Sequence, residues 1–219
     1  MAMRRMIVLL LTLAVALAGC YGAQQTRPDD PVAVGNLKPV VEDKDAGLVG
    51  LAPGFNVKQY PVVAVEPFPV TDPAIKDDGD RKLAGAMSAF LQGELVRRLR
   101  ETGVFTRVVN LAETTMPATS DRTLKLSGTI TRLGEGSQAL RAMFGAYGAG
   151  RTRTQVETRF VDMRTGQVQL VTADRRIASV GFFGGDSKDH LKESYDDMAR
   201  DLGKFLTRLA RGEMPSSKP

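Results

Sequence analysis

The fold is decided by one stretch in the middle of the chain, Thr123-Leu124-Lys125-Leu126-Ser127-Gly128-Thr129-Ile130-Thr131-Arg132-Leu133. Hydrophobic and polar residues alternate along it, which is the period of a β-strand. One side carries Leu124, Leu126, Gly128 and Ile130, and the other carries Lys125, Ser127, Thr129 and Thr131. This pattern predicts a strand that is buried on one face and wet on the other, as antiparallel sheets commonly are.

Two later stretches predict a hairpin that continues the same sheet. Residues 152–162 alternate with Val156 and Phe160 inward, and residues 167–179 form the return strand. The tripeptide Arg164-Thr165-Gly166 between them is typical of a tight turn. The outward positions of the first of these strands are charged, namely Arg153, Glu157 and Arg159.

Upstream of these strands, the chain predicts a strand–helix–strand unit. The apolar run 61–68 is a short buried strand that proline ends, and 81–102 is a helix with one apolar stripe. Gly103 is a fitting helix terminator, and 104–109 returns as a strand. We expect a right-handed parallel crossover.

A second helix closes the folded region over residues 188–211, where apolar residues repeat at spacings of three and four and Gly212 ends the pattern. Two helices and about five strands predict the α+β class. We expect a two-layer sandwich with a mixed sheet of about five strands and both helices packed on one face.

Residues 1–19 have the form of a lipoprotein signal peptide. Arg4 and Arg5 precede an apolar run, 7–18, that is too short to span a bilayer comfortably. The run ends in Leu17-Ala18-Gly19-Cys20, where small side chains at a cleavage site are followed by cysteine. This lipobox pattern predicts cleavage after Gly19 and attachment of a diacylglycerol, and of a further acyl chain such as palmitate, to Cys20.

Two other interpretations of this segment stay open, an ordinary cleaved signal and an uncleaved membrane helix. The polar run 24–30 disfavours the helix, and Cys20 left unpaired would be awkward in an oxidising compartment. Tyr21 stands where the inner-membrane retention signal of enteric bacteria has aspartate. We therefore expect a lipid-anchored protein of the outer membrane that faces the periplasm.

Composition limits the chemistry. Removal of the signal leaves 28 Lys and Arg against 25 Asp and Glu, a balance too mild to indicate nucleic acid. Cys20 and His190 are the only residues of their kinds, which excludes disulfides and multi-histidine metal sites. Asp77-Asp78-Gly79-Asp80 lacks the glutamate of a calcium loop, and the glycine-rich 145–150 precedes a strand rather than a helix. We expect no enzymatic activity, no metal and no cofactor.

The expected organisation has three parts after the signal. Residues 20–58 contain four prolines and two charged runs, which predicts a lipidated cysteine and a flexible tether of about 35 Å. Its later half, 48–57, has enough apolar residues to lie along the domain instead. Residues 59–212 form the periplasmic domain, and 213–219 a disordered tail.

Four stretches of the domain, taken in order, resemble a known family. They are Val63-Ala64-Val65-Glu66-Pro67-Phe68, Glu101-Thr102-Gly103-Val104-Phe105, Leu140-Arg141-Ala142-Met143-Phe144-Gly145-Ala146-Tyr147-Gly148-Ala149-Gly150 and Val161-Asp162-Met163-Arg164-Thr165-Gly166. The chain is similar over about 60–211 to the bacterial lipoprotein family called domain of unknown function 4410. The resemblance implies the fold and an envelope location, and no activity.

The predicted strands bring two glycine-rich loops, 134–151 and 181–186, to one end of the sheet. Both carry large apolar residues, namely Leu140, Met143, Phe144 and Tyr147 in the first and Phe182 and Phe183 in the second. We hypothesise an exposed patch that docks a protein partner, a second copy or the membrane surface. The alternative is that these side chains close the end of the core.

Arginines are frequent on or beside the predicted strands, namely Arg132, Arg141, Arg151, Arg153, Arg159, Arg175 and Arg176. They would suit anionic headgroups, or else belong to a solvated face with cross-strand pairs to acids such as Glu157. The function that we expect is a non-catalytic envelope lipoprotein serving as an assembly or interaction module. The alternative is a binder of lipid, glycolipid or another small envelope ligand.

Overall fold

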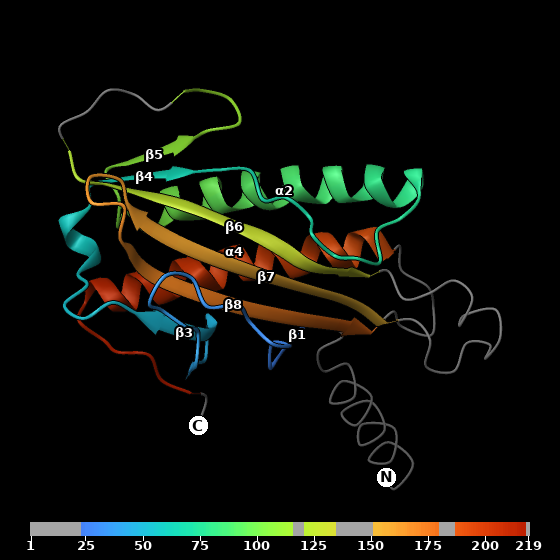
Figure 1. The fold of residues 1–219 in the computed structure, drawn as a ribbon, viewed down its shortest axis with the longest axis horizontal. Coiled ribbons are helices and arrows are strands. Elements are labelled where there is room, and N and C mark those ends of the chain that lie inside the picture. The colour runs from blue at the N-terminus through green and yellow to red at the C-terminus, as the bar shows by residue number, and fades with distance from the viewer. Residues whose placement is uncertain (1–22, 116–120, 135–150, 180–186, 218–219) are drawn as a thin grey trace, which may run out of the picture.

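The structure is a computed structural model, and it describes residues 23–115, 121–134, 151–179 and 187–217. These residues form an α+β domain in which two long helices lie against a mixed sheet (Figure 1). The predicted class is therefore confirmed. The predicted count of about five strands is wrong, because the sheet has eight.

The strand order is β2-β3-β8-β7-β6-β4-β5, and β1 pairs with β8 beside that path. The five strands expected from the sequence are β4 (Val62–Val65), β5 (Arg107–Asn110), β6 (Thr123–Gly134), β7 (Arg151–Asp162) and β8 (Val168–Ser179). The three additional strands are β1 (Gln24–Thr26), β2 (Val41–Asp43) and β3 (Gly47–Leu51). All three come from the segment that we predicted to be a tether.

The strand–helix–strand unit is present, with β4 and β5 parallel. Between them, α2 (Asp78–Thr102) begins where the Asp77 carboxylate accepts a hydrogen bond from the Asp80 amide at 2.8 Å. It ends at Gly103, whose φ of 65° lies in the left-handed region that glycine adopts without strain. The helix starts three residues before the predicted residue 81, because Asp77 alone is the cap and Asp78, Gly79 and Asp80 already belong to the first turn.

Strands β6, β7 and β8 form the predicted antiparallel meander. The inward positions of β6 are buried, with Leu124, Leu126 and Ile130 all at 0% exposure. A bulge between Ile130 and Arg132 shifts the inward–outward alternation by one residue, so that Leu133 also faces the core. In the pairing of β6 with β7 and of β7 with β8, residues that face the core lie opposite residues that also face the core.

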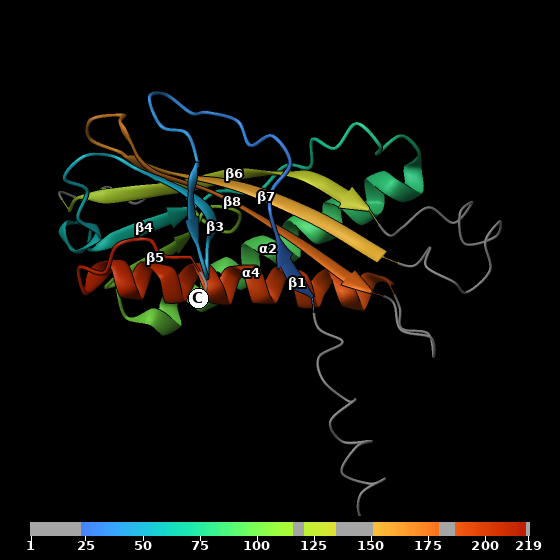
Figure 2. The same cartoon turned by 90° about the horizontal axis from the view of Figure 1, so that it is seen from below.

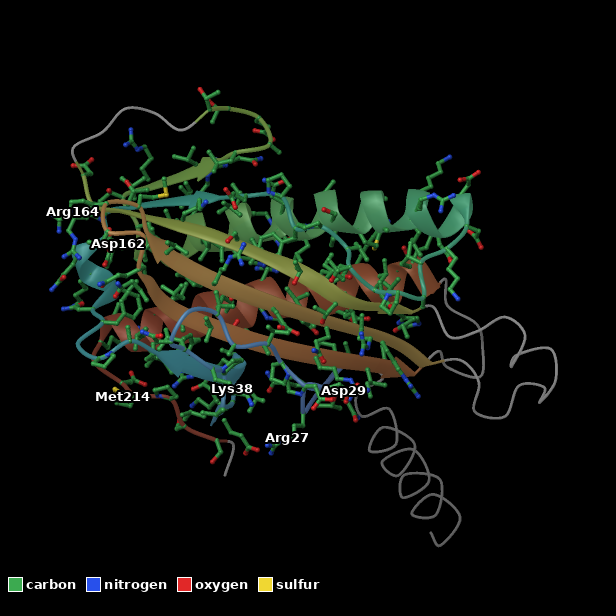
Figure 3. The ribbon with its side chains drawn as sticks, in the orientation of Figure 1. Arg27, Asp29, Lys38, Asp162, Arg164 and Met214 are labelled. Atoms are coloured by element: carbon green, nitrogen blue, oxygen red, sulfur yellow. The ribbon has the colours of Figure 1, made fainter. Side chains whose placement is uncertain are left out.

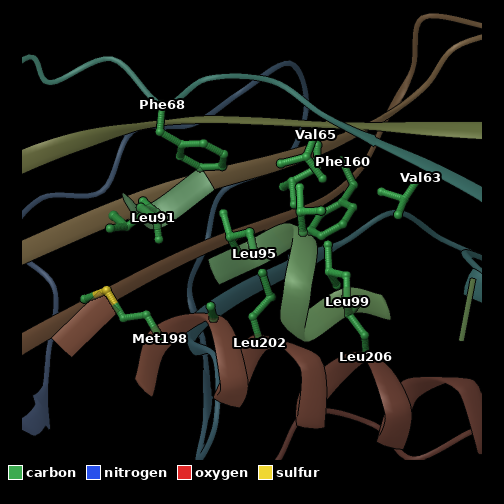
Figure 4. Close-up of a cluster of buried hydrophobic side chains, with 14 of the residues drawn as sticks. Val63, Val65, Phe68, Leu91, Leu95, Leu99, Phe160, Met198, Leu202 and Leu206 are labelled. Atoms are coloured by element: carbon green, nitrogen blue, oxygen red, sulfur yellow. The ribbon is translucent and has the colours of Figure 1, made fainter. Parts of the chain in front are cut away.

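The second helix, α4 (Ser187–Ala210), lies beside α2 on the same face of the sheet (Figure 2). The two helices run in the same direction, because Arg98 pairs with Asp196 and Thr102 lies beside Gly203. One hydrophobic core fills the space between the helices and the sheet (Figure 4). It includes Phe68, Leu91, Leu95, Leu99, Phe160, Leu202 and Phe205.

The prediction of a flexible tether over 20–58 is wrong for the residues that the structure describes. From Gln24 onward the chain is part of the sheet, because β1 and β3 both pair with β8. Residues between β1 and β2 cross the face of the sheet opposite to the helices (Figure 2). A short 3-10 helix, η1 (Val57–Gln59), then leads into β4. We call residues 24–51 the N-terminal strap.

The expected disordered tail also contacts the domain. The amide of Ser216 donates to the Asp43 carboxylate at 3.0 Å, and the Ser216 carbonyl accepts from the Lys44 amide at 2.8 Å. Residues 213–217 therefore lie along the turn between β2 and β3. Among the described residues, neither helix is long and apolar enough to cross a bilayer.

Candidate functional site

The site residues predicted from sequence all lie outside the described part of the chain. This holds for Cys20 with its cleavage residues Leu17, Ala18 and Gly19, and for Leu140, Met143, Phe144, Tyr147, Phe182 and Phe183. Lipidation and docking through these residues therefore stay predictions. The elements on either side of the two loops are described. One loop joins β6 to β7 and the other joins β8 to α4, so both leave from the same end of the sheet.

The N-terminal strap is bound to the outer face of β7 and β8 by specific hydrogen bonds (Figure 3). The main chain of Asp29 makes two bonds with the Gln155 side chain, at 2.8 and 2.9 Å. The Val32 amide donates to the Glu157 carboxylate at 3.0 Å. Because of this cover, Gln155 is only 1% exposed although it lies on the predicted wet face.

The arginines expected on the strands divide between the two faces of the sheet. On the outer face, Arg175 pairs with Asp29 at 2.6 Å and Arg159 donates to the Ser127 hydroxyl at 2.8 Å. The expected partner Glu157 binds the strap and the Thr131 hydroxyl instead. Arg132 and Arg153 are exposed towards the end of the sheet where the strap begins.

Arg176 faces the other way and is buried at 5% exposure. It pairs with Asp174 at 2.8 Å and with Asp201 of α4 at 2.9 Å. Gln25 of β1 donates to the same Asp174 carboxylate at 3.2 Å. Burial raises the pKa of Asp174, and the Arg176 guanidinium opposes that rise. The cluster ties β1, β8 and α4 together, and Asp201 also accepts a hydrogen bond from Lys204 on α4 at 2.8 Å.

A second buried cluster closes the opposite end of the sheet. The Asp162 carboxylate accepts from the Tyr60 hydroxyl at 2.8 Å and from Arg122 at 3.1 Å, and Arg122 lies 4.5 Å from the centre of the Tyr60 ring. Its other oxygen accepts the Arg164 amide at 2.8 Å and so shapes the hairpin turn. Burial alone would raise the pKa of Asp162, but these hydrogen bonds lower it to about 2. The carboxylate is held ionised as a structural anchor.

A groove of about 500 Å³ opens between the C-terminal halves of α2 and α4 and the turn after β2. Its cationic lining comprises Lys44, Arg98, Arg200, Lys204, Arg208 and Arg211, against the acids Asp45 and Glu101. Lys44 and Arg211 are exposed. Since both helices end here, the groove also lies at the negative ends of two helix dipoles, which the basic side chains offset.

The interior between the helices and the sheet offers almost no free space. The cavity lined by Leu91, Leu95, Val156, Met198 and Leu202 measures about 20 Å³, room for about one water molecule. This cavity between the helices and the sheet is too small for an acyl chain or a sugar.

The residues weighed for catalysis or metal binding have local structural contacts. Asp77 caps α2, and His190 lies 3.6 Å from the Glu193 carboxylate in the first turns of α4. Across the described residues, no three His, Cys, Asp or Glu side chains gather to hold a metal ion. The strap contacts were missed from the sequence, because their signal is polar residues more than 120 positions away in the chain.

The described residues form an α+β domain with a well-packed core and an N-terminal strap over its sheet. The chain belongs to the family described as domain of unknown function 4410, whose family model matches residues 64–181. The predicted family is thereby confirmed. The match covers the sheet from β4 to the end of β8 and leaves the strap and α4 outside.

Several solved structures are similar in outline. The PelC dodecamer from Paraburkholderia phytofirmans is 14% identical, with a TM-score of 0.44 over 70% of this chain and 94% of that one. Protein XCC0632 from Xanthomonas campestris, of domain of unknown function family 330, is 8% identical, with a TM-score of 0.44 over 80% and 95%. A Caulobacter crescentus protein described provisionally as a lipoprotein is 14% identical, with a TM-score of 0.38 over 73% and 96%. No curated protein matches the chain.

Proposed function

We propose that this protein is a lipid-anchored envelope lipoprotein whose domain works as a non-catalytic assembly or interaction module. The anchor is acylated Cys20, and the location is the periplasmic side of the outer membrane, as the lipobox and Tyr21 predict. The partners would be the membrane, through the acyl chains, and a protein or a second copy of this chain.

The observation that carries the proposal is the filled interior. A carrier of lipid or glycolipid needs a cavity of several hundred Å³, whereas the cavity lined by Leu91, Leu95 and Met198 between helices and sheet measures about 20 Å³. The buried charges of the described domain also have partners within it, such as Arg176 with Asp174. We therefore expect the domain to bind its partner through its surface. This supports an interaction module over a protein that binds a ligand in its interior.

The groove between α2 and α4 favours a second candidate function, the binding of a small anionic envelope ligand. Six cations line about 500 Å³ of open space there. Titration with inorganic pyrophosphate tests this directly. Binding that Lys204→Glu and Arg211→Glu weaken at least tenfold would support the second candidate, and absence of binding at millimolar concentration would remove it.

The anchor is tested by acyl labelling in cells. Growth with a clickable fatty acid should label the chain, and the Cys20→Ser variant should be unlabelled and leave the membrane fraction. If the parent chain were found in the membrane fraction without the fatty-acid label, the proposed anchor would be wrong. In-cell crosslinking followed by mass spectrometry then identifies what the anchored domain contacts.

The loop patch needs its own variant, with Phe144, Tyr147, Phe182 and Phe183 replaced by serine. If the loops dock a partner, the thermal melting temperature stays within a few degrees while the crosslinked partner is lost. A folded variant that keeps every crosslink would overturn docking through the loops, and loss of folding would assign these side chains to the core.

A further inference from the structure

We infer that the end of the sheet where β1 meets β8 is held against the lipid surface, because the anchor that we propose leaves the domain almost no slack. The inference rests on the proposed acylation of Cys20. It replaces a domain on a long tether with a domain of fixed orientation. The occupant of this surface is a lipid bilayer with anionic headgroups.

The first step is the length of free chain. Gln24 is already paired with Ile177 in the sheet, and only four residue steps separate it from Cys20. Four fully extended residues span at most about 14 Å. A 38-residue flexible tether would instead have reached about 35 Å. The lipid headgroups therefore lie within about 14 Å of Gln24.

The second step is the place where that short chain leaves. Strand β1 runs antiparallel to β8, and Gln24 lies opposite Ile177, two residues before β8 ends at Ser179. The neighbouring residue on β7 is Arg153. The hairpin turn at Arg164 lies at the other end of β7, about 30 Å away. Figure 1 shows β1 beside the terminal part of β8, far from that turn.

The third step is that the strap is fastened along its length. The Gln25 side chain binds both Asp174 and the Asp45 carbonyl at 3.2 Å. Further on, Asp29 is held by Gln155 and by Arg175. Release of the strap would break all of these bonds together. In the folded protein, the free chain between Cys20 and the sheet therefore stays short.

The exposed cations of the outer face near this end suit a headgroup surface, whereas the exposed acids Asp78 and Asp189 lie at the helix N-termini on the other face. Arg132 and Arg153 are exposed on the outer face near the exit of the chain. Two acids of the same face are engaged by the protein, Asp29 with Arg175 and Glu157 with the Val32 amide. Exposed guanidinium groups pair well with lipid phosphates. The two loops that leave this end lie outside the described residues and form no part of the proposed surface.

The test uses the full acylated protein in vesicles that contain one-third phosphatidylglycerol and a lipid with a headgroup-attached nitroxide quencher. A single cysteine carries a fluorophore, either at Arg153→Cys near β1 or at Arg164→Cys at the distant turn. Both positions are exposed, and acylation of Cys20 leaves the new thiol as the only free one. We expect at least twofold stronger quenching at position 153.

A matched variant lengthens the chain with twenty Gly and Ser residues between Ala23 and Gln24. We expect it to bring the two positions to equal quenching, because its added chain reaches about 25 Å. Equal quenching in the acylated parent protein, bound to vesicles, would overturn the orientation and leave the anchor standing. Protein that carries no acyl chain by mass spectrometry and stays in solution would overturn the anchor, and the orientation with it.

Discussion

The two faces of the sheet are built by different chemistry from the same strands. The inner face packs aliphatic and aromatic side chains against α2 and α4 and buries two ionic clusters. The outer face carries hydroxyl, amide and charged side chains. The N-terminal strap binds some of them through individual hydrogen bonds. The inner face therefore supplies the packed core, whereas the outer face holds the residues of the strap between β1 and β2.

Two consecutive residues of β8 show this contrast most sharply. Arg175 and Arg176 differ only in the face to which the strand directs them, and both pair with aspartates. The aspartate of the outer pair is half exposed, with 49% of the Asp29 side chain accessible, while the inner arginine is 6% accessible. Solvent screening reduces the first interaction and not the second.

The largest effect is expected for Arg176→Ala, which leaves Asp174 buried without its cation, while Asp201 keeps Lys204 and Arg200. We expect a loss of about 3–5 kcal/mol in the free energy of unfolding, measured by urea denaturation. The matched variant Arg175→Ala should lose about 1 kcal/mol or less. Equal losses in the two variants would show that the faces do not differ as described.

A glycine on the outer face tests how closely the strap lies. A Cβ on Gly50 would meet the Lys38 carbonyl oxygen at 2.4 Å, so Gly50→Ala must push the neighbouring residues 38–40 away from β3. We expect a loss of about 1–3 kcal/mol and faster amide exchange in residues 38–40. The control is Gly93→Ala on α2, where a Cβ meets nothing within 4 Å and should stabilise the helix slightly. Unchanged exchange in Gly50→Ala would contradict the close approach.

The Asp162 cluster gives the inner face a pH dependence. The folded-state pKa of Asp162 is about 2, below its usual value of 3.8, so the ionised group favours the folded state above about pH 4. That contribution, about 2 kcal/mol, is lost as the pH falls towards 2. The stability difference between the parent chain and Asp162→Asn should therefore shrink over this range. A difference independent of pH would show that the carboxylate charge is not what matters.

The smallest effect is expected for Asp29→Ala, which removes a half-exposed carboxylate of the strap that pairs with Arg175. We expect less than about 1 kcal/mol in global stability, because the bonds of the Asp29 main chain to Gln155 remain. Local exchange of the Val32 amide should nevertheless rise, since the strap loses its pair with Arg175. Global loss above 2 kcal/mol would mean that the strap is part of the folding core.

Much of the inner face could be predicted from the sequence. The alternation around Leu124, Leu126 and Ile130 and the helical stripe of α2 report burial directly, since the periodicity of a strand or helix is local. Gly103 likewise marked the end of α2 through its backbone conformation. The family stretch Val161-Asp162-Met163-Arg164-Thr165-Gly166 is explained by the structure, because Asp162 binds the turn and the core cluster at once.

The N-terminal strap could not be predicted, because its partners on both faces of the sheet are distant in the chain and polar. Strand β1 has only three residues, Gln24-Gln25-Thr26, and its side chains find Asp174 and its neighbours about 150 positions later. Prolines at 28, 31 and 39 suited a tether equally well. The candidate docking residues remain untested for another reason, since they lie outside the described residues.

The pairing of β1 and β3 with β8 also sets the order in which the molecule can mature. The strand that receives the amino terminus is the last one to leave the ribosome, with Ile177 some 150 residues behind Gln24. Contacts of such long range form late in folding. The strap must therefore wait for nearly the whole polypeptide before it can pair, and until then the edge of β8 is free to pair with other chains.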